Sequence, residues 1–170
     1  MHIRPARATD AAGIAAIYEH YVRRSVLTAD TDDPPTARDW EQRLEQLAAT
    51  GYPALVAVED GTIVGYALLA PWLDKPAFAH TAESSIYLDP HAVGAGLGRQ
   101  LLARLVDAAR DCGIREVIAL VADADDHGRA SRALHRAAGF QTAGRLQRVG
   151  FKRGRSTDVD LLQLSLQPGN

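Results

Sequence analysis

The chain has 170 residues, of which 46% are hydrophobic, and a formal net charge of −2. This length and apolar content suffice for one core, so residues 1–170 are predicted to form a single domain. The slightly acidic balance disfavours nucleic acid or an anionic membrane surface as the main partner. Cys112 is the only cysteine, which excludes a disulfide framework and a cysteine-based metal cluster. The N-terminus lacks a signal-peptide core and no apolar run reaches transmembrane length, which predicts a cytoplasmic protein.

Hydrophobic periodicity and turn residues predict the order strand, two helices, three strands, helix, strand, helix and two strands. Strands are expected at 2–5, 54–58, 62–69, 86–88, 116–121, 140–149 and 159–166. Helices are expected after a cap at Thr9 or Asp10, after a cap at Thr36, from the glycines at 94–98 to near 113, and at 130–138. The segment 123–128 is predicted to be a polar loop. Three consecutive strands in the middle favour a largely antiparallel sheet with one parallel crossover.

A glycine-rich loop connects the strand that ends at Leu88 to the following helix. Gly94, Gly96 and Gly98 allow a sharp turn without a Cβ in the way. Apolar residues then recur at helical spacing over 97–105, so the helix begins within or just after the glycines. Because a helix N-terminus preceded by bare backbone N–H groups binds phosphate oxygens, the segment predicts a phosphate-bearing ligand.

Three general interpretations of this loop compete. A P-loop requires Gly-Lys-Ser/Thr, and the only lysines, Lys75 and Lys152, lie far from the loop in sequence. A dinucleotide fingerprint requires a third glycine where Arg99 stands, in an early βαβ unit. A structural turn without a ligand needs fewer than three alternating glycines. The P-loop is excluded, and the other two interpretations are disfavoured.

The segment 93–98 resembles the acyl-CoA-binding motif of the GNAT N-acetyltransferase superfamily, usually written Q/R-x-x-G-x-G/A. Val93 stands where the motif opens with Gln or Arg; this removes one polar contact but leaves the backbone N–H groups. Further segments in the same order are similar to the phosphinothricin and methionine sulfoximine acetyltransferase-like branch. They are 17–21, 34–36, 60–61, 64–67, 134–135 with 139–140, and 150–152.

The resemblance implies an α/β fold of the three-layer GNAT type, with a mixed, mostly antiparallel sheet flanked by helices on both faces. It implies acetyl-CoA as cosubstrate, no metal, a homodimer, and direct acetyl transfer to the primary amine of a small amino acid-like substrate. The residues predicted to bind the cofactor are Ile86, Tyr87, Leu88, Val93, Gly94, Ala95, Gly96, Leu97, Gly98, Arg99 and Ser131.

Two titratable residues are candidates for the chemistry of acetyl transfer. Strand alternation places Glu83 on the same face as Ser85 and Tyr87, and a partly buried carboxylate there could deprotonate the amine. His135 occupies the position where many GNAT enzymes carry a tyrosine, and the resembled branch has histidine there. It could protonate the departing thiolate or hydrogen-bond the cofactor sulfur. Ser131 shares its helical face, although no G-x-S-x-G elbow suggests a Ser-His nucleophile.

The resemblance places the acceptor pocket around 28–31 and 75–80, with Asp30, Lys75 and Phe78 as substrate-binding residues. Ala29 and Lys75 stand where an aromatic residue and an arginine are usual, so the pocket is expected to be wider. Lys75 could neutralise a substrate carboxylate as a point charge.

Other functions remain open at this stage. The acidic run at 123–127 lacks the ligand spacing of calcium or zinc sites and is predicted to be a solvated loop. Within enzymes, acetylation of a protein N-terminus or lysine is the alternative. Outside them, a non-catalytic acyl-CoA-binding module is the alternative.

Overall fold

The computed structural model describes residues 1–26, 28–30, 32–123 and 126–167. The strands are β1 (His2–Pro5), β2 (Ala54–Glu59), β3 (Thr62–Pro71), β4 (Thr81–Leu88), β5 (Glu116–Asp123), β6 (Gln141–Lys152) and β7 (Arg155–Ser165). The helices are α1 (Ala11–Arg24), α2 (Ala37–Thr50), α3 (Leu97–Asp111) and α4 (Asp126–Ala137), with short 3₁₀ turns η1 (Ala8–Asp10), η2 (Pro76–Phe78) and η3 (Pro90–Ala92). The predicted order of strands and helices is therefore confirmed.

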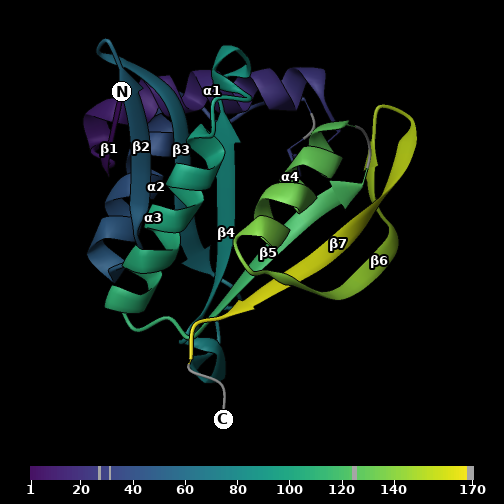
Figure 1. Cartoon of the computed structure of the whole chain (residues 1–170). Helices are drawn as coiled ribbons and strands as arrows, with labels where there is room; N and C mark the ends of the chain where they lie inside the picture. The colour runs from purple at the N-terminus through teal and green to yellow at the C-terminus, as the bar shows by residue number, and fades with distance from the viewer. Residues whose placement is uncertain (27, 31, 124–125, 168–170) are drawn as a thin grey trace.

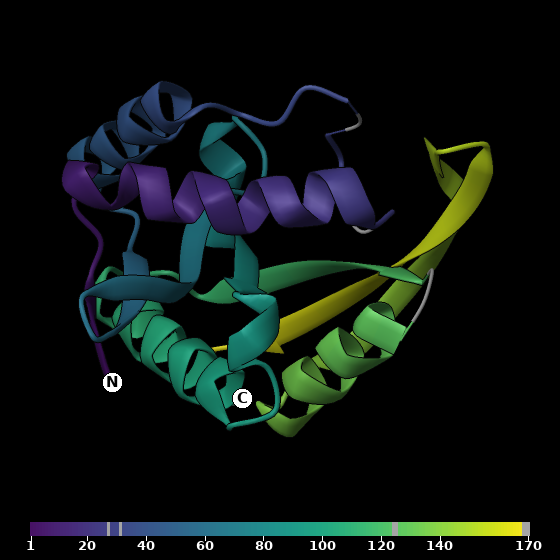
Figure 2. The same cartoon turned by 90° about the horizontal axis from the view of Figure 1, so that it is seen from above.

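All seven strands form one sheet in the order β1-β2-β3-β4-β5-β7-β6. Every neighbouring pair is antiparallel except β4 and β5, which run parallel. Helices α1 and α2 cover one face of the sheet, while α3 and α4 cover the other (Figures 1 and 2). The mixed, mostly antiparallel sheet with helices on both faces agrees with the predicted fold class. Within the described residues, no helix is both long and apolar enough to cross a membrane.

Strands β4 and β5 pair along only part of their length. The register runs from Thr81 with Glu116 to Ser84 with Ala119, although both strands continue for four more residues. Figure 1 shows the two strands diverging beyond this point as a V. At the free end of β4, the Tyr21 hydroxyl of α1 donates to the Leu88 carbonyl oxygen at 2.8 Å. The divergence opens the middle of the sheet, where backbone groups would otherwise be paired.

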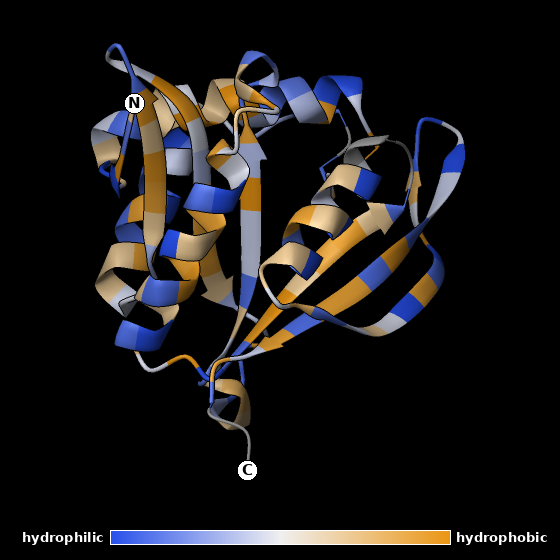
Figure 3. Ribbon diagram, in the orientation of Figure 1, coloured by the Kyte–Doolittle hydropathy of each residue, from blue (hydrophilic) through white to orange (hydrophobic). Residues whose placement is uncertain are grey.

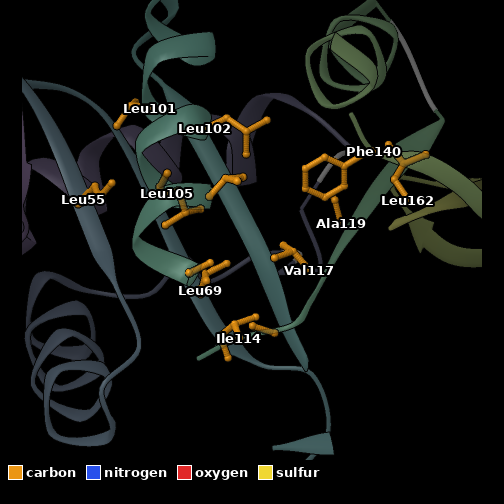
Figure 4. Packing of buried hydrophobic residues seen from close by; sticks show 14 of the residues in the cluster. Leu55, Leu69, Leu101, Leu102, Leu105, Ile114, Val117, Ala119, Phe140 and Leu162 are labelled. Carbon is orange, nitrogen blue, oxygen red and sulfur yellow. The ribbon is translucent and has the colours of Figure 1, made fainter. Parts of the chain in front are cut away.

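Two hydrophobic clusters occupy the two faces of the sheet. On one face α3 presents Leu101, Leu102 and Leu105 to the strands, as Figure 4 shows, and polar and apolar residues alternate around this helix (Figure 3). On the other face, α1 and α2 pack an aromatic-rich cluster against β2 and β3. Because side chains alternate along β4, Glu83, Ser85 and Tyr87 share one face, as predicted, and this is the face that α1 and α2 cover. Ile86 and Leu88 pack with the α3 cluster on the other face.

Backbone geometry confirms the predicted cap at Thr36 and shows how β2 turns into β3. The Thr36 hydroxyl accepts from the Asp39 N–H, and the Asp39 carboxylate accepts from the Thr36 N–H, which forms a capping box at the start of α2. Asp60 and Gly61 join β2 to β3 with φ values of 48° and 80°. Positive φ at both central residues is the requirement of the tight hairpin that Asp-Gly favours.

The predicted polar loop at 123–128 is wrong at both ends, because β5 extends to Asp123 and α4 begins at Asp126. Gly128 lies in the first turn of this helix, and a Cβ added there would stand 2.3 Å from the Ala122 carbonyl oxygen. The glycine therefore permits close packing of α4 on β5 and does not end a helix. A run of polar residues with glycine resembles a loop in sequence, and only the neighbouring strand reveals the other reason for the glycine.

Asp10 precedes α1, but its carboxylate bonds Arg4 at 2.6 and 2.8 Å and the Arg7 N–H at 2.8 Å instead of the first turn of α1. The hydrogen bonds from Arg4 lower the pKa of Asp10. Because Asp10→Ala leaves the partly buried Arg4 guanidinium and the Arg7 N–H without their acceptor, it should destabilise the fold by about 1–3 kcal/mol in urea titrations. The Asp107–Arg110 pair on α3 is exposed, so Asp107→Ala should change stability little and serves as the control.

The pH dependence of this contribution has a definite sign. A carboxyl whose pKa is lowered by folding stabilises the native state fully above its unfolded pKa of about 3.9. The stabilisation is then lost as the pH falls through the lowered native pKa. Asp10→Ala should therefore cost less stability at pH 3 than at pH 7, and an equal cost at both would contradict this role for the ion pair.

Candidate active site

A cavity of about 1100 Å³ fills the V between β4 and β5. Its lining comes from both faces of the sheet. From the face of α3 and α4 come the glycine loop, Ser131 and His135, and from the other face come α1, α2 and the β6–β7 hairpin. The cavity thus connects the predicted phosphate cradle to the predicted base through an opening in the sheet.

The glycine loop and the N-terminus of α3 form one wall. Gly94 and Gly96 have φ values of 94° and 79°, a region that side chains rarely adopt, and open space surrounds the position of a Cβ at both. The first N–H groups of α3 have no partner inside the helix. Bare backbone donors, the positive end of a fifteen-residue helix and free space in front of them fit the pyrophosphate of coenzyme A.

The other loop residues predicted to bind the cofactor divide into two groups. Val93, Gly98 and Arg99 line the cavity, as do Ile86, Tyr87 and Leu88 of β4. Ala95 is not part of the lining, and the Leu97 side chain is buried in the core beneath α3. Leu97 therefore anchors the start of the helix, and any contact with the ligand from these two residues would come through their backbone.

His135 is a buried residue of α4, with 3% of its surface exposed. Its Nδ1 lies 2.8 Å from the Ser131 carbonyl oxygen, and the ring packs edge-on against Phe140. Because a carbonyl oxygen only accepts, Nδ1 carries the proton and Nε2 is the bare nitrogen of a neutral ring. Nε2 is buried without a hydrogen-bond partner among the described residues. Burial lowers the pKa of His135, so the ring is neutral at pH 7.

Glu83 lines the cavity on the side of α1 and α2, at the point where the pairing of β4 and β5 ends. Burial raises the pKa of its carboxyl, and the positive charge of Arg43 acts in the opposite direction. A carboxylate with a raised pKa is a stronger base than an exposed one. Glu83 thus lies in the cavity wall with a pKa above that of an exposed glutamate, and its role as a base stays a prediction.

Aromatic residues build the wall around Glu83. Tyr18 contacts Trp40 and Tyr87 edge-on, with ring centroids 5.5 and 5.2 Å apart, and Tyr66 stacks on Tyr87 at 5.6 Å. The Trp40 indole nitrogen and the Tyr66 hydroxyl are buried without partners among the described residues. Trp40 is in the core and also lines the cavity. Its helical spacing with Leu44 and Leu47 explains the core position but gives no sign of the cavity.

Lys152 is a cavity residue that the sequence analysis did not identify as functional. It is 5% exposed, and its Nζ donates to the Thr28 hydroxyl at 2.7 Å and to the Asp30 carbonyl oxygen at 2.6 Å. The Asp30 carboxylate accepts from the Tyr18 hydroxyl at 2.6 Å. Asp30 therefore lies in the cavity wall as predicted, and a lysine from the far end of the chain holds its loop.

Lys75 and Phe78 are not brought to this cavity. Both are exposed in or next to η2, the turn before β4, and neither belongs to the lining. Of the acidic run at 123–127, Asp123 forms ion pairs with Arg132 and Arg145, which connect β5 to α4 and β6. Asp125 lies outside the described residues, as do the side chains of Asp126 and His127. Within the described residues, no three potential metal ligands gather.

The profile of the acetyltransferase (GNAT) family matches residues 14–140. The chain belongs to this family. It is 40% identical to the L-amino acid N-acyltransferase MnaT of Escherichia coli, over 98% of this chain and 94% of the relative. It is 38% identical to a phosphinothricin N-acetyltransferase of Alcaligenes faecalis, over 99% and 84% of the two chains.

The solved structures agree with these relatives. The acetyltransferase yncA from Salmonella typhimurium, solved with acetyl-CoA, superposes with a TM-score of 0.93 at 35% identity, over 100% of this chain and 96% of the other. The resemblance read from the glycine loop and from the scattered segments is thus confirmed at the level of the family and its phosphinothricin acetyltransferase-like branch.

Proposed function

We propose that this protein transfers an acetyl group from acetyl-CoA to the primary amine of a small amino acid-like substrate. The observation that carries the proposal is the cavity through the sheet, which joins the glycine-loop cradle on one face to the Glu83 carboxylate on the other. The names of the relatives, which include an L-amino acid N-acyltransferase and a phosphinothricin N-acetyltransferase, favour an amino acid-like acceptor.

In the proposed mechanism the two substrates meet in a ternary complex within the V. Acetyl-CoA supplies the activated acetyl group as a thioester. Backbone N–H groups of the glycine loop and of α3 hold its pyrophosphate, and Ser131 lies along the same wall. Glu83 accepts a proton from the acceptor ammonium, which makes the nitrogen a nucleophile. The second proton of the attacking nitrogen then goes to the departing thiolate, so no separate acid is required.

His135 enters this mechanism as a neutral ring. An imidazolium that protonates the thiolate would require a charge in a buried position, and burial opposes that charge. The bare Nε2 can instead accept a hydrogen bond within the cavity wall, for example from the thiol of the product. The role that the geometry supports is therefore a hydrogen-bond acceptor beside the cofactor.

We further propose a cytoplasmic homodimer that uses no metal and has no nucleic acid or membrane partner. The dimer rests on the family resemblance and on apolar side chains exposed on β6, where Phe151 is 71% and Val149 57% exposed. Light scattering on the purified protein measures the state, and a monomer at micromolar concentration would contradict the dimer.

Thiol release from acetyl-CoA over a panel of amines tests the proposed function. The panel holds phosphinothricin, L-methionine sulfoximine, other small L-amino acids, polyamines, and peptides with a free N-terminus or lysine. We expect turnover with small L-amino acids or their analogues and little with the peptides. Turnover restricted to peptides would indicate a protein acetyltransferase, and acetyl-CoA binding without any turnover would indicate a binding module.

A further inference from the structure

We propose that Arg43 on α2 binds the α-carboxylate of the acceptor, and so selects amino acids over simple amines. This inference rests on the proposed function and adds the determinant of its substrate class. Arg43 lies outside the glycine-loop motif and outside the segments 28–31 and 75–80 where the resemblance places the acceptor pocket.

The position of Arg43 suits a ligand with a negative charge. Arg43 lines the cavity, and its guanidinium carbon lies 5.0 Å from the centroid of the Trp40 ring. Contact with an aromatic face holds the guanidinium plane in place while its N–H groups remain available. Among the described residues, Arg43 has neither an ion pair nor a hydrogen bond. The buried, unpartnered Trp40 indole N–H adds a second donor to the same wall.

The other cations near the acceptor side are less suited to this role. Lys152 is buried and directs two of its three donors to the Thr28 hydroxyl and the Asp30 carbonyl oxygen. Lys75 and its turn lie outside the lining. Arg99, the other arginine of the lining, stands beside the glycine loop on the face of α3. On the side of α1 and α2, Arg43 therefore has guanidinium donors available, and a guanidinium matches a carboxylate in a bidentate manner that an ammonium cannot.

The pair Arg43 and Glu83 matches a zwitterion. Arg43 lies close enough to lower the pKa of Glu83 through its charge, so the two groups act on the same region of the cavity. An α-amino acid carries its ammonium and its carboxylate on one carbon atom. With the carboxylate at Arg43, the ammonium lies on the side of Glu83, where the proton is to be removed. A simple amine has no group for Arg43 and gains no such orientation.

Matched substrates and variants test this assignment. The best L-amino acid of the amine panel and its carboxamide differ only in the group that Arg43 is proposed to bind. For Arg43→Gln, kcat/KM for the acid should fall about 10- to 100-fold, mainly through KM, because a charge-assisted bidentate contact is lost. The carboxamide should change less than about twofold. Arg43→Lys keeps the positive charge but loses the paired N–H donors of the guanidinium, so its kcat/KM for the acid should lie between those of the wild type and Arg43→Gln.

The controls separate this role from its alternatives. Arg38→Gln removes an exposed charge from the same helix, outside the cavity, and should leave both substrates unaffected. An equal loss on acid and carboxamide, with the acid limb of the pH profile moved to higher pH, would mean that Arg43 acts only through Glu83 and would overturn the proposal. A carboxylate-selective loss in Lys75→Gln instead of Arg43→Gln would also overturn it. If the wild type acetylates no amino acid, the proposed function itself fails.

Discussion

Replacing Glu83 with glutamine should lower kcat by about 10²–10⁴-fold, which is the usual contribution of a general base. The amide keeps the size of the side chain but cannot accept the proton of the acceptor ammonium. Binding of acetyl-CoA should persist, because the cradle lies on the other face of the sheet. Steady-state thiol release and calorimetric titration of acetyl-CoA measure the two properties separately.

The pH profile gives an independent readout of the same base. Because burial raises the pKa of Glu83, the wild-type rate should fall with decreasing pH at a higher pH than an exposed glutamate would give. This decrease of the rate toward low pH should be absent from the residual activity of Glu83→Gln. Glu59→Gln, which changes an exposed glutamate at the end of β2, serves as the control and should retain full activity. Wild-type turnover in Glu83→Gln would rule out this residue as the base.

The second large effect is expected for Gly96→Val. Gly96 has a φ of 79° at the N-terminus of α3, and valine would both strain this backbone and place methyl groups in front of the N–H cradle. Affinity for acetyl-CoA should fall at least about tenfold, because the pyrophosphate needs close approach to bare N–H groups. Isothermal titration calorimetry with acetyl-CoA measures the loss.

Gly51→Val is a matched control for strain. Gly51 ends α2 with a φ of 78°, and open space surrounds its Cβ position, as at Gly96, but it lies outside the cavity. Valine there should cost similar stability and leave acetyl-CoA affinity intact. Unchanged affinity in Gly96→Val would refute the assignment of the loop. An equal loss of affinity in both variants would mean that strain and not the cradle explains the effect.

The glycine-loop side of the candidate site could be located from sequence because its determinants are local. Alternating glycines, the preceding strand and the helical leucines lie within about twenty consecutive residues, and each acts through the backbone of its own segment. The phase of β4 was equally accessible, since strand alternation alone places Glu83 with Tyr87. The family resemblance was enough to single out His135, but the sequence could not show which of its ring nitrogens carries the proton. That nitrogen is fixed by the Ser131 carbonyl oxygen one turn earlier.

The predicted substrate-binding residues agree only in part with the cavity lining, because the wall around Glu83 is assembled from distant segments. Lys152 bonds Thr28, which lies 124 positions earlier in the chain. Arg43 lines the cavity from α2, and the apolar residues of this helix indicate only which of its faces is buried. Lys75 was favoured by its place in a family segment, whereas the fold leaves it exposed outside the cavity. The hydrophobic periodicity of one segment does not predict which exposed residues of separate helices and strands come together in the fold.

The sequence by itself determined the order of the elements, the position of the glycine loop before α3 and the family, because these depend on local backbone preferences and on short-range spacing. Only the tertiary structure decided that β4 and β5 separate after Ser84, which turns the loop on one face and the carboxylate on the other into parts of one site. Where two strands stop pairing depends on the helices packed on both faces and on the strands beyond them. That balance of long-range contacts is not encoded in any single segment.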